Sequence, residues 1–202
     1  MDFWSKVANV YDLAEVINGK VYREMVSLTG RLVPRGARVL DCAAGTGELS
    51  LAAAKKASSV LCTDNSDKML SVAARKAERR GLENISFERR NIFHLDDKDG
   101  TYDVVIAGNV LHLLAEPENA VKELCRVTKS GGRILLPTFT SENSSALTDT
   151  LLWIYEKMGF ESNTEYSPKR YVEMLRATNC GRVKAKLIRG PVPCCYAVII
   201  KD

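Results

Sequence analysis

The stretch VLDCAAGTGELS, residues 39–50, joins an apolar run to a helix-like segment through a loop of small residues. The apolar run ends at Asp41, and Gly45 and Gly47 follow within the loop. Glycine lacks a Cβ atom, so a ligand can approach the backbone closely at these positions. The helix that follows presents free N–H groups at its first turn. The stretch therefore predicts a strand–loop–helix unit that binds a nucleotide, without saying which one.

Strand-like and helix-like segments alternate around this loop. Runs rich in β-branched and apolar residues predict strands at residues 37–43, 59–64, 85–91, 102–108 and 132–139. The helices expected between them are residues 48–57, a segment that starts after Ser66 and ends at Gly81, and a segment that starts at Pro117 and ends at the Gly131–Gly132 pair. Such alternation indicates a parallel sheet covered by helices on both faces.

The C-terminal third breaks this alternation. Amphipathic helices are expected at residues 144–160 and 167–179. Two strand-like runs follow, residues 182–190 and 194–202, and the few residues that join them allow only an antiparallel pair. The predicted fold is therefore α/β: a Rossmann-like, mostly parallel sheet with an antiparallel C-terminal hairpin and helices on both faces.

Composition sets limits on the class of protein. The chain has 202 residues, of which 46% are hydrophobic and 27% charged, as is usual for one globular domain. Its net charge of +4 is too small to predict a nucleic acid partner, which would need a concentrated basic face. Glutamates are interleaved with the basic cluster, which favours a solvated face. The cluster comprises Arg75, Lys76, Arg79, Arg80, Arg89 and Arg90.

The cysteines and the N-terminal segment bear on the compartment. None of the 6 cysteines forms a C-x-x-C pair, and their spread is unlike a disulfide framework. Cys194 and Cys195 are adjacent, but with only 2 histidines in the chain we expect no metal site. Residues 1–16 lack the apolar core of a signal peptide, and no run approaches the ~20 apolar residues that cross a bilayer. We therefore expect a cytoplasmic protein with free thiols and no membrane insertion.

The acids beside the loop discriminate between nucleotides. Gly45, Gly47 and Ser50 partly match the dinucleotide fingerprint, and Asp64 ends the next strand at the distance where that fingerprint expects an acid for a ribose diol. However, Asp41 would repel a pyrophosphate, and Ser50 stands where the fingerprint ends in glycine or alanine. The chain also ends in a hairpin, where a dinucleotide-binding fold would have its second mononucleotide-binding half. A nicotinamide-dependent oxidoreductase therefore stays only as an alternative.

Five motifs, taken in order, resemble those of class I S-adenosylmethionine-dependent methyltransferases: VLDCAAGTGELS, VLCTDNSDKML, FERRNIF, TYDVVIAGNVLHLL and ELCRVTKSGGRILLPTF. The likeness covers roughly residues 11–139 and the terminal hairpin. Residues 3–12, FWSKVANVYD, further resemble the small-molecule branch that includes ubiquinone/menaquinone-biosynthesis and phosphatidylethanolamine methyltransferases. The resemblance implies a seven-stranded sheet, S-adenosylmethionine as cofactor with S-adenosylhomocysteine as product, and a small-molecule acceptor.

The resemblance also implies which residues surround the cofactor. The methionine part would lie against Asp41, the backbone of the loop and the segment after the fourth strand, and Asp64 would hold the ribose. The full set is Tyr11, Asp41, Ala43, Gly45, Gly47, Asp64, Asn65, Met69, Asn91, Ile92, Asn109 and Val110. Asn65, Met69, Asn91 and Ile92 of this set would border the adenine, and Tyr11 would close over the carboxylate end.

Two members of this set depart from the family pattern. Ala43 stands where the family usually has its first glycine, a replacement that its members often show. Asn91 stands in place of a common aspartate, and its amide still offers a carbonyl oxygen to the adenine amino group.

Methyl transfer from a sulfonium is an in-line displacement that needs no metal ion, so the protein supplies alignment, exclusion of water and removal of a proton. His112 is the candidate general base because its ordinary pKa lies near neutrality, and simple packing or capping is the alternative role. A non-catalytic subunit that keeps the fold is a further alternative for the whole chain. The acceptor and the oligomeric state are not indicated by the sequence.

We expect one methyltransferase domain over residues 1–202. Within it, residues 1–36 would form an N-terminal helical lid, residues 37–140 the cofactor-binding half, and residues 141–202 the substrate-side helices and the terminal hairpin.

Overall fold

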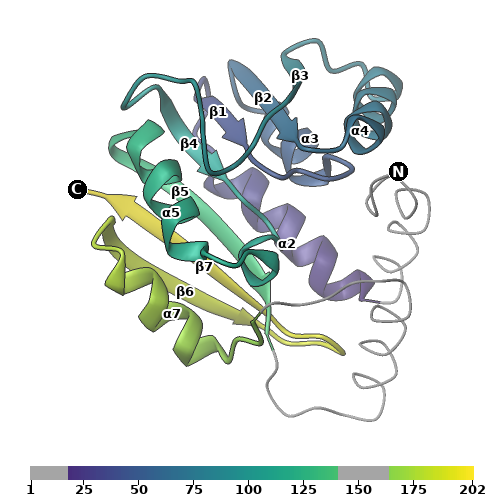
Figure 1. The fold of residues 1–202 in the computed structure, drawn as a ribbon. Coiled ribbons are helices and arrows are strands. Elements are labelled where there is room, and N and C mark those ends of the chain that lie inside the picture. The colour runs from purple at the N-terminus through teal and green to yellow at the C-terminus, as the bar shows by residue number, and fades with distance from the viewer. Residues whose placement is uncertain (1–17, 141–163) are drawn as a thin grey trace.

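A computed structural model of the chain describes residues 18–140 and 164–202. Within these residues a 7-stranded sheet has the order β3-β2-β1-β4-β5-β7-β6 (Figure 1). The strands are β1 (Arg38–Asp41), β2 (Ser59–Asp64), β3 (Ile85–Arg89), β4 (Tyr102–Ile106), β5 (Thr128–Phe139), β6 (Gly181–Ile188) and β7 (Cys194–Lys201). The helices are α2 (Gly19–Leu32), α3 (Glu48–Ala54), α4 (Asp67–Arg79), α5 (Pro117–Val127) and α7 (Pro168–Ala177), with a short 3-10 helix, η1 (Leu111–Leu113). The helix expected at residues 144–160 lies outside the described residues.

The sheet is mixed in the way that the sequence predicts. β1 to β5 pair in parallel, while β7 runs antiparallel between β5 and the edge strand β6. Helices cover both faces: α2, α3 and α4 pack on one, and α5 and α7 on the other (Figure 1). The predicted α/β fold with its antiparallel terminal hairpin is thus confirmed. No helix among the described residues is both long and apolar enough to cross a membrane.

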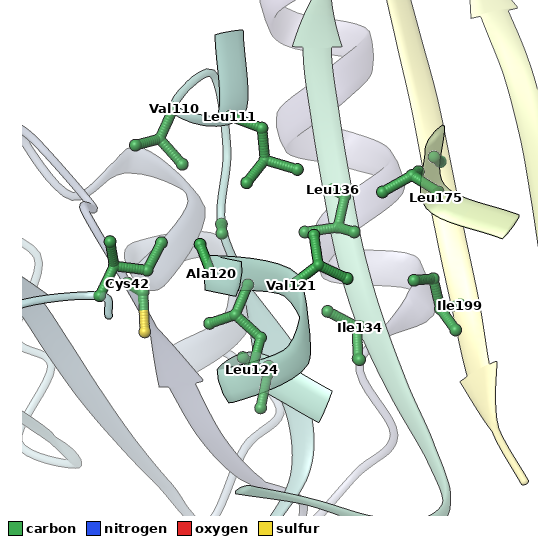
Figure 2. Close-up of a cluster of buried hydrophobic side chains, with 14 of the residues drawn as sticks. Cys42, Val110, Leu111, Ala120, Val121, Leu124, Ile134, Leu136, Leu175 and Ile199 are labelled. Atoms are coloured by element: carbon green, nitrogen blue, oxygen red, sulfur yellow. The ribbon is translucent and has the colours of Figure 1, made fainter. Parts of the chain in front are cut away.

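Alternation along the strands divides the core between the two faces. Figure 2 shows Val121 and Leu124 of α5 packed with Ile134 and Leu136 of β5, and all four side chains are fully buried. On the same side, the Tyr171 hydroxyl of α7 donates to the Leu136 carbonyl at 3.1 Å. This face therefore forms one continuous apolar layer under α5 and α7.

The Gly131–Gly132 pair does not end a helix, contrary to the sequence-based expectation. α5 already ends at Val127, and β5 begins at Thr128. The register between β4 and β5 shifts across the glycines, where Gly131 has a φ of +71° and a Cβ on Gly132 would lie 2.7 Å from the Lys129 carbonyl oxygen. The glycines thus permit an irregularity inside a strand, which the local sequence does not distinguish from a helix stop.

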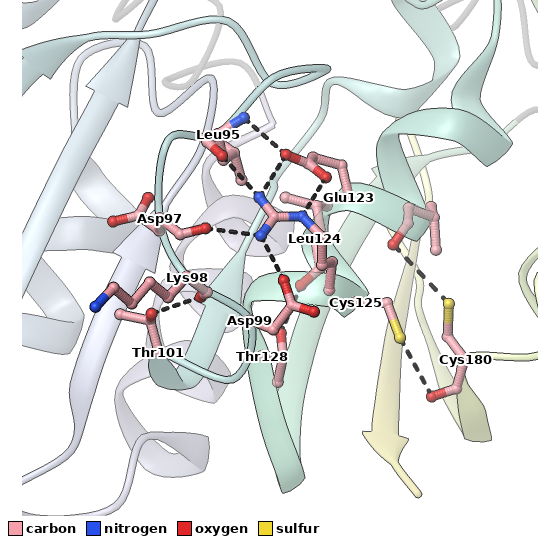
Figure 3. Close-up of polar contacts among 12 residues, drawn as sticks. Leu95, Asp97, Lys98, Asp99, Thr101, Glu123, Leu124, Cys125, Thr128 and Cys180 are labelled. Atoms are coloured by element: carbon pink, nitrogen blue, oxygen red, sulfur yellow. Dashed lines mark hydrogen bonds and ion pairs between the residues drawn. The ribbon is translucent and has the colours of Figure 1, made fainter.

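The connection between β3 and β4 contains no helix and is held by one arginine of α5 (Figure 3). Arg126 donates to the carbonyls of Leu95 and Asp97 at 2.7 Å and pairs with Asp99 and Glu123. Because these bonds fix the backbone at several points, the loop that leaves the carboxyl end of β3 has a defined path without a helix.

A buried hydroxyl pair fastens α2 to the sheet. Thr29 Oγ1 lies 2.6 Å from the Tyr196 hydroxyl of β7 and also donates to the Met25 carbonyl, so Tyr196 is the donor to Thr29.

Thr29→Val leaves the Tyr196 hydroxyl buried without its acceptor, and we expect a loss of about 1–3 kcal/mol in the free energy of unfolding. Adding Tyr196→Phe removes the stranded donor, so the double variant should lose less than the two single losses together. Urea unfolding of all four proteins measures this, and strictly additive losses would contradict it.

Candidate active site

The carboxyl ends of β1, β2 and β4 meet at one edge of the sheet because these strands are adjacent and parallel. Asp41 ends β1 and is level with Cys62 of β2 and Ile106 of β4. Asp64 therefore lies one pleat further along on one side, and Asn109 follows β4 on the other. In open α/β sheets, ligands bind at this edge. The fold thus gathers three of the residues that the sequence singles out.

The loop after β1 turns sharply through three left-handed residues. Ala43, Gly45 and Gly47 have φ values of +51°, +56° and +82°. A Cβ on Gly47 would lie 2.7 Å from the Ala73 Cβ of α4, whereas nothing lies within 4 Å of the position of a Cβ on Gly45. Gly47 is therefore required for close packing, and Gly45 borders open space. The Gly47 N–H closes the turn by donating to the Ala44 carbonyl at 3.0 Å.

Asp64 is held by two backbone amides. The Gly45 N–H donates to Oδ2 at 2.8 Å, and the Ser66 N–H donates to Oδ1 at 2.9 Å. The side chain is 7% exposed at the end of β2. A carboxylate offers about four acceptor positions, and the two amides fix its direction. A ligand that carries paired hydroxyls suits this arrangement.

Asp41 is the most deeply buried acid of the site, with 1% of its surface exposed. The Ser50 hydroxyl of α3 donates to Oδ2 at 2.6 Å, while Oδ1 has no hydrogen-bond partner within the described parts of the chain. Burial raises the pKa of Asp41 to about 7, with a smaller contribution from the negative charge of Asp64 and partial opposition from the Ser50 bond. Asp41 is thus poised to gain a donor or a cation.

Asn109 presents a second unsatisfied oxygen. It has a φ of +53°, and its backbone N–H donates to the Pro137 carbonyl at 2.8 Å. The residue is 8% exposed, and its Nδ2 is directed to the Met25 sulfur at 3.8 Å. Oδ1 has no hydrogen-bond partner among residues 18–140 and 164–202. A buried acceptor left in this condition is costly unless a ligand supplies the donor.

The acceptors at this edge define the kind of ligand that fits. Asp41, Asp64 and Asn109 all offer oxygen, so a matching ligand brings N–H or O–H donors and preferably a positive charge. S-Adenosylmethionine carries an ammonium group, a sulfonium and a ribose diol, and the residues present fit it. A pyrophosphate would bring more negative charge to two carboxyls. In the part of the chain that the structure covers, no three His, Cys, Asp or Glu side chains are grouped as metal ligands.

The residues expected beside the adenine lie in different surroundings. Met69 and Ile92 are buried, at 2% and 8% exposure, and offer apolar surface. Asn65 is exposed next to Asp64. Asn91 is also exposed, and its Oδ1 accepts the Phe93 N–H at 3.0 Å, so the carbonyl expected to meet the adenine amino group already closes a local turn.

The remaining expected residues are distributed as follows. Val110 is 7% exposed and directly precedes η1. Tyr11 lies outside the described residues, as does most of the N-terminal segment, of which α2 is described.

His112 lies in η1, next to Thr138 near the end of β5. Its Nδ1 is 3.0 Å from the Thr138 hydroxyl, and its carbonyl accepts the Thr164 N–H at 3.1 Å. Burial lowers the pKa of His112 to about 4, so the imidazole is neutral at pH 7. A neutral ring is the form that can accept a proton, but the lowered pKa makes it a weak base. The role of His112 as general base therefore stays a prediction.

Sequence reasoning missed three residues that shape the site. In the sequence Ser50 is only a mismatch to the dinucleotide fingerprint, whereas in the structure its hydroxyl donates to Asp41. Met25 and Thr138 approach Asn109 and His112 from α2 and β5, which are distant in sequence. The spacing of Ser50 from Asp41 across the glycine loop was the available signal, whereas the other two contacts depend on how the elements pack.

Comparison with known proteins places the chain in a family. A family profile described as "Methyltransferase domain" matches residues 34–178. The chain belongs to this family. The resemblance to class I methyltransferases is thereby confirmed, and S-adenosylmethionine is the cofactor of that class.

Individual methyltransferases resemble the chain to different extents. The ubiquinone/menaquinone biosynthesis C-methyltransferase UbiE of Bdellovibrio bacteriovorus is 34% identical over 149 residues, covering 70% of this chain and 62% of that protein. The phosphatidylethanolamine N-methyltransferase of Cereibacter sphaeroides is 38% identical over 103 residues, or 50% of each protein. The chain thus spans less than two thirds of the length of these relatives. A crystal structure of a SAM-dependent methyltransferase from Thermotoga maritima has a TM-score of 0.78 at 17% identity, with 99% of each chain covered, and supports the shared fold.

The raised pKa of Asp41 predicts a pH-dependent cost to stability. The group binds its proton more tightly when folded, at a pKa of about 7, than when unfolded, at about 4. Between about pH 4 and pH 7 the unfolded chain has lost this proton and the folded chain still holds it, so the free energy of unfolding falls as the pH rises. In Asp41→Asn this penalty is absent, so the stability of the variant relative to the natural chain should rise across that window and level off above it.

Urea unfolding at pH 5, 6, 7 and 8 measures the difference. His112 acts in the opposite direction, because its pKa is lowered to about 4 and its contribution is lost as the pH falls, but it is common to both proteins and cancels. Parallel pH profiles for the two proteins would contradict the expectation.

Proposed function

We propose that this chain transfers a methyl group from S-adenosylmethionine to a small organic acceptor without a metal ion. The observation that carries the proposal is the pair of buried oxygens without a hydrogen-bond partner in the described residues, Asp41 Oδ1 and Asn109 Oδ1, beside the amide-held carboxylate of Asp64. These groups call for donors and positive charge, which the cofactor has at its ammonium, its diol and its sulfur.

The methionine end of the cofactor would lie between β1 and β4. Asp41 and Asn109 would accept hydrogen bonds from its ammonium, which would hold Asp41 in its ionised form. The Gly45 and Gly47 N–H groups are already used within the protein, so the loop would offer backbone carbonyl oxygens there, including that of Ala43. The open space beside Gly45 leaves room for this approach.

The nucleoside end would lie over β2. Asp64 would accept from both ribose hydroxyls, because the Gly45 and Ser66 amides already fix its two oxygens in direction. Met69 and Ile92 would supply apolar contacts to the adenine ring. Asn65, Asn91 and Val110 remain neighbours of the cofactor in this proposal, with Asn91 bound to its own turn through Oδ1.

The chemistry that the cofactor supplies is a methyl group on positively charged sulfur, open to in-line displacement. The protein's part is to align the acceptor, exclude water and take a proton where the acceptor carries one. His112 is neutral at pH 7 and lies just past β4, so we retain it as the group that takes the proton. Its bond to Thr138 would fix the orientation of the ring.

For the acceptor we propose a hydroxylated aromatic ring of the quinone type. The relative that covers more of the chain, UbiE, is named for C-methylation in ubiquinone and menaquinone biosynthesis, whereas the phosphatidylethanolamine enzyme matches half of the chain. Removal of a proton from a ring hydroxyl would raise electron density at the neighbouring carbon. That carbon would bond to the methyl group as the bond from the methyl group to sulfur breaks, and loss of the carbon's own proton would restore the aromatic ring with its hydroxyl. Assays with a soluble hydroxylated demethylquinone analogue and with phosphatidylethanolamine vesicles separate the two acceptor classes.

Asp64→Ala tests the cofactor site. We expect at least a tenfold weaker affinity for S-adenosylmethionine and S-adenosylhomocysteine, because a buried charged acceptor for two hydroxyls is lost. Isothermal titration measures both affinities, and Asp67→Ala, which removes an exposed acid from the next turn, is the matched control. Unchanged binding in Asp64→Ala would overturn the assignment. Binding of NAD but not of S-adenosylmethionine to the natural chain would overturn the proposed function.

His112→Ala tests the proposed base. We expect the turnover number to fall by about 10²–10⁴, the usual contribution of general acid–base catalysis, with the affinity for the cofactor unchanged. The matched control is His94→Ala, since His94 is exposed on the loop after β3. Full turnover in His112→Ala would remove it from the mechanism, and cofactor binding without turnover on any acceptor would favour a non-catalytic subunit.

A further inference from the structure

The sequence predicts that the basic cluster is solvated, but its member Lys76 is buried in the structure. Lys76 of α4 is only 9% exposed. Its ammonium lies 3.1 Å from Glu48 Oε1 and donates to the Thr46 hydroxyl at 3.1 Å. A charged group is costly to bury unless it is paired and hydrogen-bonded, and here both conditions are met. Lys76 is buried because its side chain points back to the glycine-rich loop and not to solvent.

The partner Thr46 occupies the middle of that loop. It lies between Gly45, whose N–H holds Asp64, and Gly47, which caps the start of α3. Its side chain is buried, with 2% exposed. Because glycine on either side leaves the backbone with wide conformational freedom, the Thr46 side chain is a point at which another element can fix the loop.

α4 grips the loop at more than this one point. Ala73, one turn before Lys76, packs against Gly47 so closely that a Cβ there would come within 2.7 Å of its own. One turn after Lys76, Arg80 binds both oxygens of Glu48 at 3.0 Å. Residues spaced by three and four lie on the same side of a helix. This face of α4 therefore holds both the loop and the first turn of α3.

We infer that Lys76 is a positioning residue that fixes the glycine-rich loop through Thr46 and thereby sets the cofactor site. The inference rests on the proposed function, to which it adds a residue that does not touch the cofactor. When Thr46 is held, the Gly45 N–H stays directed at Asp64, and the carboxylate keeps the orientation that a diol needs. When it is released, the loop samples other conformations, and binding must pay to order it again.

Thr46→Val is the sharpest variant because it removes the hydroxyl and keeps both the shape and the Lys76–Glu48 ion pair. We expect about tenfold weaker S-adenosylhomocysteine binding by isothermal titration, as for loss of one hydrogen bond to a charged group. Thr46→Ser keeps the hydroxyl and should restore most of the affinity. Near-natural affinity in Thr46→Val, or no recovery in Thr46→Ser, would overturn the inference.

Lys76→Met tests the other end of the contact. It should weaken S-adenosylhomocysteine binding at least as much as Thr46→Val, and the double variant should be no weaker than Lys76→Met alone, because both changes break one interaction. Lys68→Met, at an exposed position of the same helix, is the matched control. Additive losses in the double variant, or a Lys76→Met protein that loses thermal stability but binds normally, would show a purely structural role.

Hydrogen exchange of the ligand-free chain tests the inference independently of the cofactor. In Thr46→Val the loop amides of Ala44, Gly45 and Gly47 should exchange roughly tenfold faster, while the amides of β1 and β2 keep their protection. In the natural chain these three amides donate to the Thr63 carbonyl, the Asp64 carboxylate and the Ala44 carbonyl. Unchanged loop exchange overturns the inference. If the natural chain fails to bind S-adenosylhomocysteine yet the loop loosens as expected, the proposed function fails and the positioning role stands.

Discussion

The hydrogen bond from the Gly45 amide to the Asp64 carboxylate joins the loop after β1 to the end of β2. The bond fixes the path of the loop and the direction of the Asp64 carboxylate at the same time. The bond is possible only because Gly45 takes a left-handed φ, and because parallel pairing puts the ends of the two strands side by side. Two residues of the α4 region add to this contact: the Ser66 N–H donates to the other oxygen of Asp64, and Lys76 donates to the Thr46 hydroxyl of the loop.

Much of this arrangement can be predicted from the sequence because it is local. Apolar runs predict the strands, Asp41 and Asp64 follow at the ends of two of them, and the glycines after Asp41 predict the turn. The short connection before β7 is enough to predict antiparallel pairing. The placement of Asp41 and Asp64 at one edge then follows from a parallel sheet, without knowledge of any side-chain contact.

What the sequence does not reveal depends on contacts between distant segments. The Gly131–Gly132 pair has the composition of a helix stop, but strand pairing extends β5 through it. The residues next to Lys76 in the sequence are typical of a solvated lysine, because its partners Glu48 and Thr46 are 28 and 30 residues earlier. In each case a local pattern has two outcomes, and only packing selects one.

The unsatisfied oxygens of Asp41 and Asn109 indicate how stability and binding oppose one another in this fold. Burial raises the pKa of Asp41 to about 7, so without a cation the site gains from holding a proton. A cofactor ammonium would make the ionised form favourable and would satisfy oxygens that otherwise lie buried without partners in the described residues. The loop must therefore be held by contacts that do not depend on the cofactor. Lys76 meets that requirement, because its ion pair with Glu48 involves no ligand. An ion pair that does not involve Asp41 or Asn109 can thus hold the loop while their buried oxygens have no partner in the described residues.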